Sequence, residues 1–191
     1  MPSISSEYVI LGLTGMPGSG KGELSNIAHS LGIPIRSMGD VVRAFFKINC
    51  PDRDPIETGV YANEERERFG KDIWARRLLL EVDSLLSSGE TIVIIDGIRS
   101  MSEVDIFREK WGENLKIICV HSSPGTRFER LSIRGRNDDP SGYREFVERD
   151  LRELGWGVGN VIATADIMLI NEGDIDNMKR ESERVIREMI P

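Results

Sequence analysis

The sequence GMPGSGKGE at residues 15–23 decides the fold, because it fits the pattern G-x-x-x-x-G-K between an expected strand and an expected helix. The apolar, β-branched run Tyr8–Thr14 precedes it, and the segment Gly20–Leu31 that follows has helical periodicity. Glycines in such a turn let successive backbone N–H groups converge on a phosphate, and the dipole of the helix strengthens that field. Lys21 adds an ammonium group that reaches the β- and γ-phosphates. The stretch therefore predicts a cradle for the phosphate chain of a nucleotide.

The position after Lys21 bears on how a metal ion would be held. Gly22 stands where many such loops carry a hydroxyl residue that binds Mg²⁺. The ion would then be held by nucleotide oxygens, waters and a carboxylate from elsewhere. Asp96 is the candidate, since it ends an apolar run and ligands bind beyond the carboxyl ends of parallel strands, although it could also be a simple turn residue. Glu23 could lie behind the direct ligands, or it could serve only the helix dipole.

The rest of the chain alternates short apolar runs with longer segments of helical period, which predicts an α/β protein with a parallel sheet covered on both faces. The other expected strands are Thr91–Asp96, Leu115–His121, Asp166–Asn171 and, more weakly, Ile33–Arg36. The expected helices are Gly20–Leu31, Gly39–Lys47, Glu64–Ser88, Met101–Trp111, Pro124–Ile133, Ser141–Leu154 and Asp174–Met189. Two polar, turn-rich segments, Ile48–Gly59 and Arg134–Gly142, are expected to form a loop and a mobile flap.

Composition limits the class of function. The 191 residues suffice for one domain, and contents of 39% hydrophobic and 30% charged residues are typical of a globular protein. A formal net charge of -7 argues against broad nucleic-acid binding. Two cysteines and two histidines argue against a zinc or His-based centre and favour a reduced, cytoplasmic protein. The sequence shows no signal peptide and no apolar run long enough to span a membrane, so we expect no membrane association.

One segment is rich in the cationic groups that phosphoryl transfer requires. Residues 127–136 contain Arg127, Arg130, Arg134 and Arg136, and the second and third of these are four residues apart, on one helical face. Guanidinium groups stay charged and match phosphate oxygens with a planar fork of donors. The alternative is a basic helix end that only faces solvent.

Four further blocks of sequence resemble the nucleoside-monophosphate-kinase branch of the P-loop kinases, adenylate kinase in particular. SMGDVVR at 37–43 resembles the segment whose arginine grips the acceptor phosphate, and DGIR at 96–99 is similar to D-G-F-P-R, one residue shorter. ERLSIR at 129–134 keeps two arginines at the spacing of the lid base, and RNDD at 136–139 resembles the R-x-D-D that closes the lid. Taken as a whole, the chain looks closest to archaeal adenylate-kinase-related P-loop proteins.

The resemblance implies a three-layer P-loop NTPase fold with a five-stranded parallel sheet in the order 2-3-1-4-5. It also implies one kinase-like domain over 1–191, with a core at about 7–38, 90–133 and 155–191, an acceptor-binding insert at about 39–89 and a short lid at about 134–148. The expected cofactors are ATP and Mg²⁺, the metal being held at Asp96 largely through water. The residues expected to bind ATP are Gly15, Met16, Pro17, Gly18, Ser19, Gly20, Lys21, Gly22, Glu23 and Arg130.

The implied reaction is transfer of the γ-phosphoryl group of ATP to a nucleoside monophosphate or similar small nucleotide. The residues expected to take part in catalysis are Lys21, Arg134, Arg136 and Asp40, and those expected to bind the acceptor are Asp40, Arg43 and Arg99. Asp40 orients Arg43 or a water if the acceptor is a phosphate, and is a general base if the acceptor is a hydroxyl. Either Arg149 or Arg152 could be the later arginine of the family.

Departures from the family pattern keep other functions open. The lid is short and has no cysteines, and FGKDIWARR at 69–77 is similar to deoxynucleotide monophosphate kinases instead. The last expected strand, in ADIMLINEG at 165–173, resembles the end of dephospho-coenzyme A kinase. The alternatives are therefore a dephospho-coenzyme A kinase-like hydroxyl kinase and an ATPase coupled to a macromolecular partner. The acidic balance favours a small-molecule substrate, and the sequence does not indicate an oligomeric state.

Overall fold

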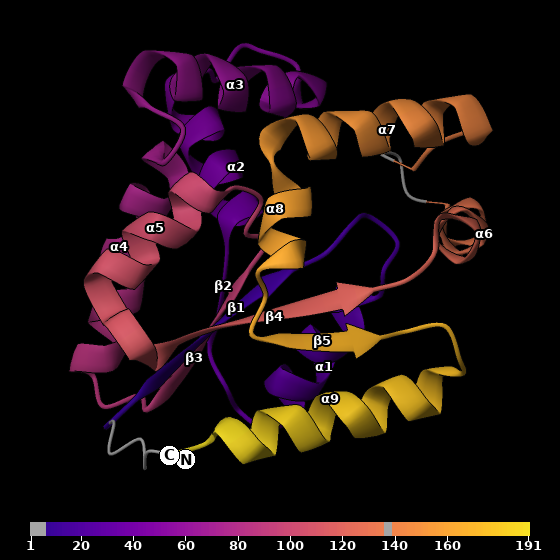
Figure 1. The fold of residues 1–191 in the computed structure, drawn as a ribbon. Coiled ribbons are helices and arrows are strands. Elements are labelled where there is room, and N and C mark those ends of the chain that lie inside the picture. The colour runs from indigo at the N-terminus through magenta and orange to yellow at the C-terminus, as the bar shows by residue number, and fades with distance from the viewer. Residues whose placement is uncertain (1–6, 136–138) are drawn as a thin grey trace.

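The computed structural model describes residues 7–135 and 139–191, so Arg136 lies outside the described residues. A sheet of five parallel strands runs through the middle of the molecule (Figure 1). The strands are β1 (Val9–Thr14), β2 (Ile35–Ser37), β3 (Ile92–Asp96), β4 (Leu115–His121) and β5 (Ile167–Ile170). Their order is β2-β3-β1-β4-β5, which confirms the expected fold class and strand order.

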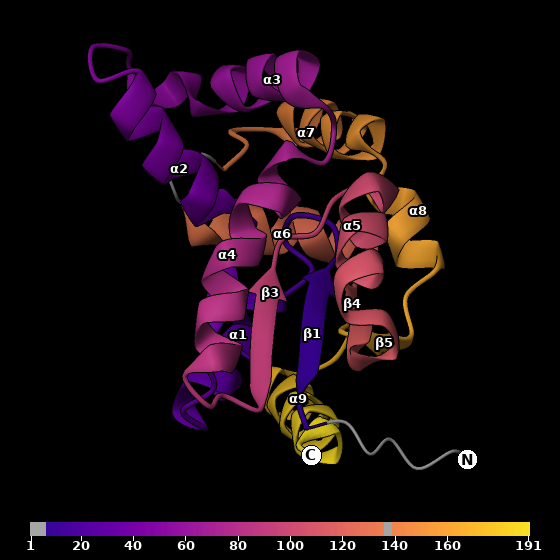
Figure 2. The same cartoon turned by 90° about the vertical axis from the view of Figure 1, so that its left-hand side faces the viewer.

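Helices cover both faces of this sheet, because each strand presents alternate apolar side chains to each face. On one face lie α1 (Lys21–Ser30) and α9 (Ile175–Met189), packed on a core that includes Leu11, Leu13 and Ile94. On the other lie α4 (Ile73–Ser87), α5 (Met101–Trp111) and α8 (Val158–Ala163), packed on Ile10, Val93 and Ile117 (Figure 2). Cys119 in β4 is fully buried, as expected for a core residue.

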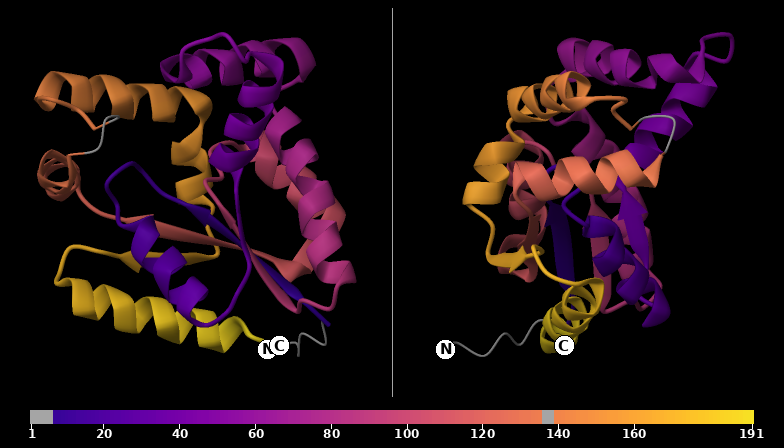
Figure 3. Two further views of the ribbon diagram at one scale, coloured as in Figure 1. Left: turned by 180° about the vertical axis from the view of Figure 1, so that it is seen from behind. Right: turned by 90° about the vertical axis from the view of Figure 1, so that its right-hand side faces the viewer.

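The remaining helices gather at the carboxyl end of the sheet, as both views in Figure 3 show. They are α2 (Met38–Asn49), the short η1 (Pro55–Glu57), α3 (Thr58–Phe69), α6 (Pro124–Arg134) and α7 (Tyr143–Trp156), while η2 (Gly112–Asn114) leads into β4. The polar loop expected at 48–59 is therefore shorter than predicted, since helical turns extend into it from both ends. The boundaries of a core, an insert and a lid stay a prediction. In the described part of the chain, no helix is both long and apolar enough to cross a membrane.

One helix prediction was wrong, and one helix was not predicted. The single helix expected at Glu64–Ser88 is two helices, because the backbone turns at Gly70 with φ 105° and α4 continues in a different direction from α3 (Figure 2). Trp74 then packs within the core and donates a hydrogen bond of 3.2 Å to the carbonyl of Ala62. The short α8 was not predicted, and it begins after a second left-handed glycine, Gly157.

Gly12 in β1 is required by close packing. A Cβ atom at this position would lie 2.5 Å from Cδ1 of Ile98 and 2.8 Å from Cδ1 of Ile117, and both isoleucines are buried. We therefore expect Gly12→Ala to lower the free energy of unfolding by about 1–3 kcal/mol, measured by urea denaturation. The matched control is Gly59→Ala in α3, where a Cβ meets nothing within 4 Å and the substitution should be neutral or stabilise by up to ~1 kcal/mol. Equal stability of the two variants would contradict this packing constraint.

Candidate active site

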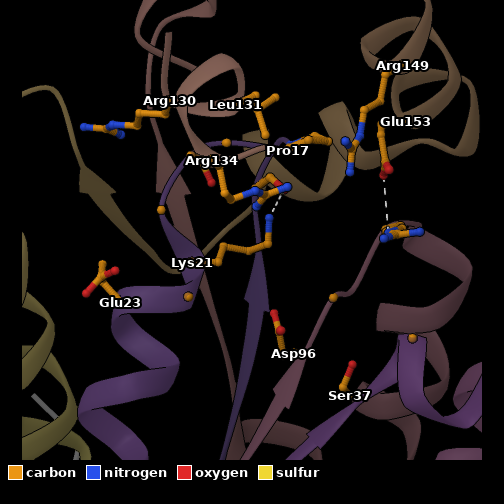
Figure 4. A pocket seen from close by; sticks show the side chains of 18 of the residues that line it. Pro17, Lys21, Glu23, Ser37, Asp96, Arg130, Leu131, Arg134, Arg149 and Glu153 are labelled. Carbon is orange, nitrogen blue, oxygen red and sulfur yellow. Dashed lines mark hydrogen bonds and ion pairs between the residues drawn. The ribbon is translucent and has the colours of Figure 1, made fainter. Parts of the chain in front are cut away.

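A cavity of about 480 Å³ opens where the loops after β1 and β3 meet α6 and α7 (Figure 4). Its position agrees with the rule that ligands of open parallel sheets bind beyond the carboxyl ends of the strands. It is lined by Gly15, Pro17, Gly18, Ser19, Gly20, Lys21, Gly22, Glu23, Ser37, Gly39, Arg43, Asp96, Gly97, Ile98, Arg99, Arg130, Leu131, Arg134, Arg149 and Glu153. The fold thus brings the glycine loop and most of the predicted arginines to one space.

The loop at residues 15–20 is pressed against the neighbouring strand. Gly15 has φ 140°, and a Cβ there would lie 2.3 Å from the carbonyl oxygen of Val120 in β4. Side chains from two other segments hold the far end of the loop, since Nδ2 of Asn171 and Oγ of Ser122 donate to the carbonyl of Ser19 at 2.9 and 3.2 Å. Asn171, which follows β5, thus braces the glycine loop. Met16 is buried and is not among the residues that line the cavity.

Lys21 and Asp96 form an electrostatic pair at the base of the cavity. The Lys21 ammonium donates to the carbonyls of Gly15 at 2.5 Å and Met16 at 3.3 Å. Burial lowers the pKa of Lys21 from its ordinary value, and the negative charge of Asp96 partly opposes that change. Burial raises the pKa of Asp96, which Lys21 and Arg99 partly oppose. Each charge is therefore poorly solvated and would gain from a ligand of opposite charge.

Asp96 fits the role of a single carboxylate for a nucleotide-bound metal ion. Its Oδ1 atom is buried and has no hydrogen-bond partner among the described residues. The same part of the chain contains no group of three or more His, Cys, Asp or Glu residues that could hold a metal on their own. Such a donor set suits Mg²⁺ that keeps several waters and binds mainly to phosphate oxygens.

Two arginines of the cavity, one from α6 and one from α7, share one carboxylate. Asp139, whose side chain is 4% exposed, accepts from Nε of Arg134 at 2.9 Å and lies 3.5 Å from Nη1 of Arg149. Figure 4 shows Arg134 and Arg149 on the side of the cavity that faces Lys21. Of the two candidates in α7, Arg149 lines the cavity, whereas Arg152 is exposed and does not.

Arg99 is held by two residues of α7 that the sequence did not single out. Its Nε lies 3.3 Å from the carboxylate of Glu153, and its guanidinium lies 5.2 Å from the ring of Trp156. Residues 149, 153 and 156 are spaced so that they share one face of a helix, which is the signal that could have found them. A single face of α7 therefore supplies both a cavity-lining arginine and the partners of a second arginine.

Arg130 and Asp40 are placed less centrally than the other predicted residues. The Arg130 guanidinium donates to Oγ of Ser122 at 2.9 Å and Oδ1 of Asn171 at 3.3 Å, and Figure 4 shows it, like Glu23, on the side away from Glu153. Asp40 is not among the lining residues, and its side chain is 72% exposed. It accepts a hydrogen bond of 2.5 Å from Nη2 of Arg43, which does line the cavity.

Arg127 is a structural brace and does not line the cavity, unlike the other arginines described in its segment. Its guanidinium is buried and makes two hydrogen bonds, of 2.8 and 2.5 Å, to the carboxylate of Asp150 in α7. Nη1 also donates to the carbonyl of Pro17 at 3.1 Å, and the group lies 5.0 Å from the ring of Phe146. Arg127 lies in the first turn of α6, so its side chain contacts α7 and the glycine loop and does not extend into the cavity.

Comparison with known proteins agrees with this architecture. A family model described as "AAA domain" matches residues 14–145. A UPF0200 protein of Hyperthermus butylicus is 44% identical over 178 residues, which cover 93% of each chain. Two solved structures share the fold. TT1252 from Thermus thermophilus has a TM-score of 0.64 and is 20% identical, and the match covers 95% of this chain and 97% of that one. A dephospho-CoA kinase from Campylobacter jejuni has a TM-score of 0.58 and is 15% identical, and the match covers 95% of this chain and 96% of that one. The resemblance to P-loop kinases expected from the sequence is confirmed at the level of the fold.

The ion pair of Arg127 with Asp150 can be tested by a double-mutant cycle. We expect Arg127→Met to lower the free energy of unfolding by about 2–4 kcal/mol, because it leaves the carboxylate of Asp150, whose side chain is 15% exposed, without its partner. Arg127→Met combined with Asp150→Leu should recover most of that loss in chemical denaturation. Arg144→Met, at an exposed arginine of the same helix α7, should change stability by less than about 0.5 kcal/mol. Independent, additive effects of the two core substitutions would refute the brace.

Proposed function

Because the chain belongs to the AAA domain family and to the UPF0200 protein family, and has the fold of P-loop kinases, we propose that it is an ATP-dependent phosphotransferase. The proposed reaction moves the γ-phosphoryl group of ATP to a nucleoside monophosphate or a similar small nucleotide. One observation carries this proposal: the glycine loop with Lys21 and the arginines of α2, α6, α7 and the loop after β3 line a single cavity.

The donor would bind on the glycine-loop side. Backbone amides of residues 15–20 would surround the β-phosphate, and Lys21 would exchange its contacts with the Gly15 and Met16 carbonyls for phosphate oxygens. Asp96 would hold Mg²⁺, largely through water, and the ion would supply neutralisation of the phosphate charge. Arg134 and Arg149, already gathered by Asp139, would stabilise charge that develops on the transferred group.

The acceptor would bind on the opposite side, between Arg43 and Arg99. Arg99 is pre-oriented, since Glu153 and Trp156 fix its guanidinium, and little side-chain entropy is lost when it binds an oxyanion. The short hydrogen bond from Arg43 to Asp40 supports an orienting role for Asp40, which suits an acceptor that is already an ionised phosphate. There are two alternatives. One is a hydroxyl kinase similar to dephospho-coenzyme A kinase, and the other is an ATPase coupled to a macromolecule.

A panel assay tests the proposed function. We expect ADP to form from ATP and Mg²⁺ only when one member of a panel of nucleoside monophosphates is added, because the transfer needs an acceptor in line with the γ-phosphate. Dephospho-coenzyme A is included to detect a hydroxyl kinase. Lys21→Ala should reduce the acceptor-dependent rate by at least about 10²-fold, since it removes a charge from the transition state. Steady ADP formation with no acceptor, unchanged by the panel, would point to an ATPase and overturn the proposal.

Arg43 offers a separate test of the acceptor side. We expect Arg43→Ala to raise the acceptor KM by roughly 10- to 100-fold and leave the KM for ATP unchanged, because a charge-assisted hydrogen bond to the acceptor is lost. Lys47→Ala, an exposed cation on the same helix α2, is the control and should change neither constant. Asp40→Asn should be mild for a phosphate acceptor and severe for a hydroxyl acceptor. An unchanged acceptor KM in the Arg43 variant would refute the assignment.

A further inference from the structure

A second cavity, of about 300 Å³, lies between α3, the start of α5 and the end of α7. Figure 1 shows α3 beside the end of α7, and the contact between Arg66 and Trp156 joins these two helices. Arg99 lines this cavity as well as the first one. A molecule whose reacting group lies at Arg99 in the first cavity can therefore extend its other end into the second.

Three cationic and two anionic side chains line the second cavity. The cations are Arg66, Lys71 and Arg99, and the carboxylates are those of Glu67 and Glu103. Arg99 already has a carboxylate partner outside the lining, Glu153, at 3.3 Å. The Oε2 atom of Glu103 accepts from the backbone amides of Arg99 and Ser100 at 2.8 and 3.2 Å as part of the capping box of α5, and only its Oε1 atom faces Arg66, at 3.9 Å.

Of the two arginines that line this cavity, Arg66 has the more distant carboxylate partner. Its side chain is 15% exposed, and its nearest carboxylate oxygen, Oε1 of Glu103, is 3.9 Å away. Its other polar contact is a hydrogen bond of 3.1 Å from Nη1 to Oδ1 of Asn63, a neutral group. Burial lowers the pKa of Arg66, with Glu103 opposing the change, which is the sign of a guanidinium that lacks a strong anionic partner.

Trp156 supports the two arginines without neutralising them. The guanidinium of Arg66 lies 5.3 Å from the indole ring, and that of Arg99 lies 5.2 Å from it. A guanidinium held over an aromatic face keeps its in-plane N–H donors free to bind an oxyanion. The indole ring of Trp156 therefore packs against the two guanidinium groups, and we do not assign it to stacking with a nucleotide base.

We propose that the second cavity binds the far end of the acceptor, and that this end carries a second anionic group, a phosphate or a carboxylate, held by Arg66. The inference rests on the proposed function for the identity of the first, reacting group. It narrows the substrate class from any nucleoside monophosphate to acceptors with two separated anionic groups. Lys71, exposed at the rim, adds long-range attraction for such a ligand.

The test compares matched pairs of nucleotides by direct binding. The intact protein, with its glycine loop saturated by a non-hydrolysable ATP analogue, is titrated with the 5′-monophosphate and the 3′,5′-bisphosphate of adenosine, guanosine, cytidine and uridine. Calorimetry gives the affinities, and the part of the tryptophan emission that is lost in the Trp156→Phe variant reports whether the ligand reaches this cavity. We expect at least one bisphosphate to bind about 10-fold or more tightly than its monophosphate and to change the emission, since it gains a charge-assisted contact.

Variants at one helix assign the effect to Arg66. Arg66→Gln should bring the ratio of the two affinities close to 1, whereas Arg66→Lys should retain part of the preference and so show that charge, not folding, is measured. Arg68→Gln, at an exposed arginine on the same helix, should leave the ratio unchanged. Equal affinities in all four pairs, or a preference that survives Arg66→Gln, would overturn the inference.

The binding measurements and the phosphoryl-transfer assay test the two proposals independently. An Arg66-dependent preference for bisphosphates without any ADP formation would uphold the anionic cavity and refute the kinase. Transfer to simple monophosphates with no gain from a second phosphate would uphold the kinase and refute the anionic cavity.

Discussion

The close approach of the glycine loop to β4 is the constraint on which the cavity depends. At Gly15 the loop lies so near the carbonyl of Val120 that no side chain fits, and this contact fixes the position of the backbone from which the Lys21 side chain extends. Asn171 and Ser122 then hold the loop from the other end, so its amides keep one direction. A preorganised set of donors of this kind needs no rearrangement when an anion arrives, which is how such sites stabilise charge at low cost.

Helix α7 connects the separate parts of the site. Near its middle, Asp150 holds Arg127 and through it the Pro17 carbonyl of the glycine loop. Arg149 and Glu153 face the first cavity, and Trp156 faces the second. A displacement of this one helix would therefore alter the glycine loop, the arginines that line the first cavity and Arg99 together. The arrangement couples the two cavities mechanically.

The sequence predicted the sheet well because parallel strands buried on both faces are continuous apolar runs, as in TIVIID and LKIICVH. It failed at Gly70, where the helical pattern continues through 64–88 while the chain changes direction, because periodicity carries no information about a turn made by one glycine. As motif spacing indicated, the fold brings one set of predicted residues to a single cavity: the glycine loop, Asp96, Arg43, Arg99, Arg130 and Arg134. Glu153 and Trp156 were missed because their importance comes from Arg99, which lies on a distant part of the chain.

Cys119 in β4 pairs in register with Thr14, the residue directly before the glycine loop, so a thiol lies close to the start of that loop. Burial raises the pKa of Cys119 to about 11, which keeps it protonated and uncharged at neutral pH. A thiolate here would repel a polyphosphate and would react with electrophiles and peroxides. The apolar surroundings of β4 thus keep this buried sulfur in the thiol form, which is the less reactive of its two protonation states.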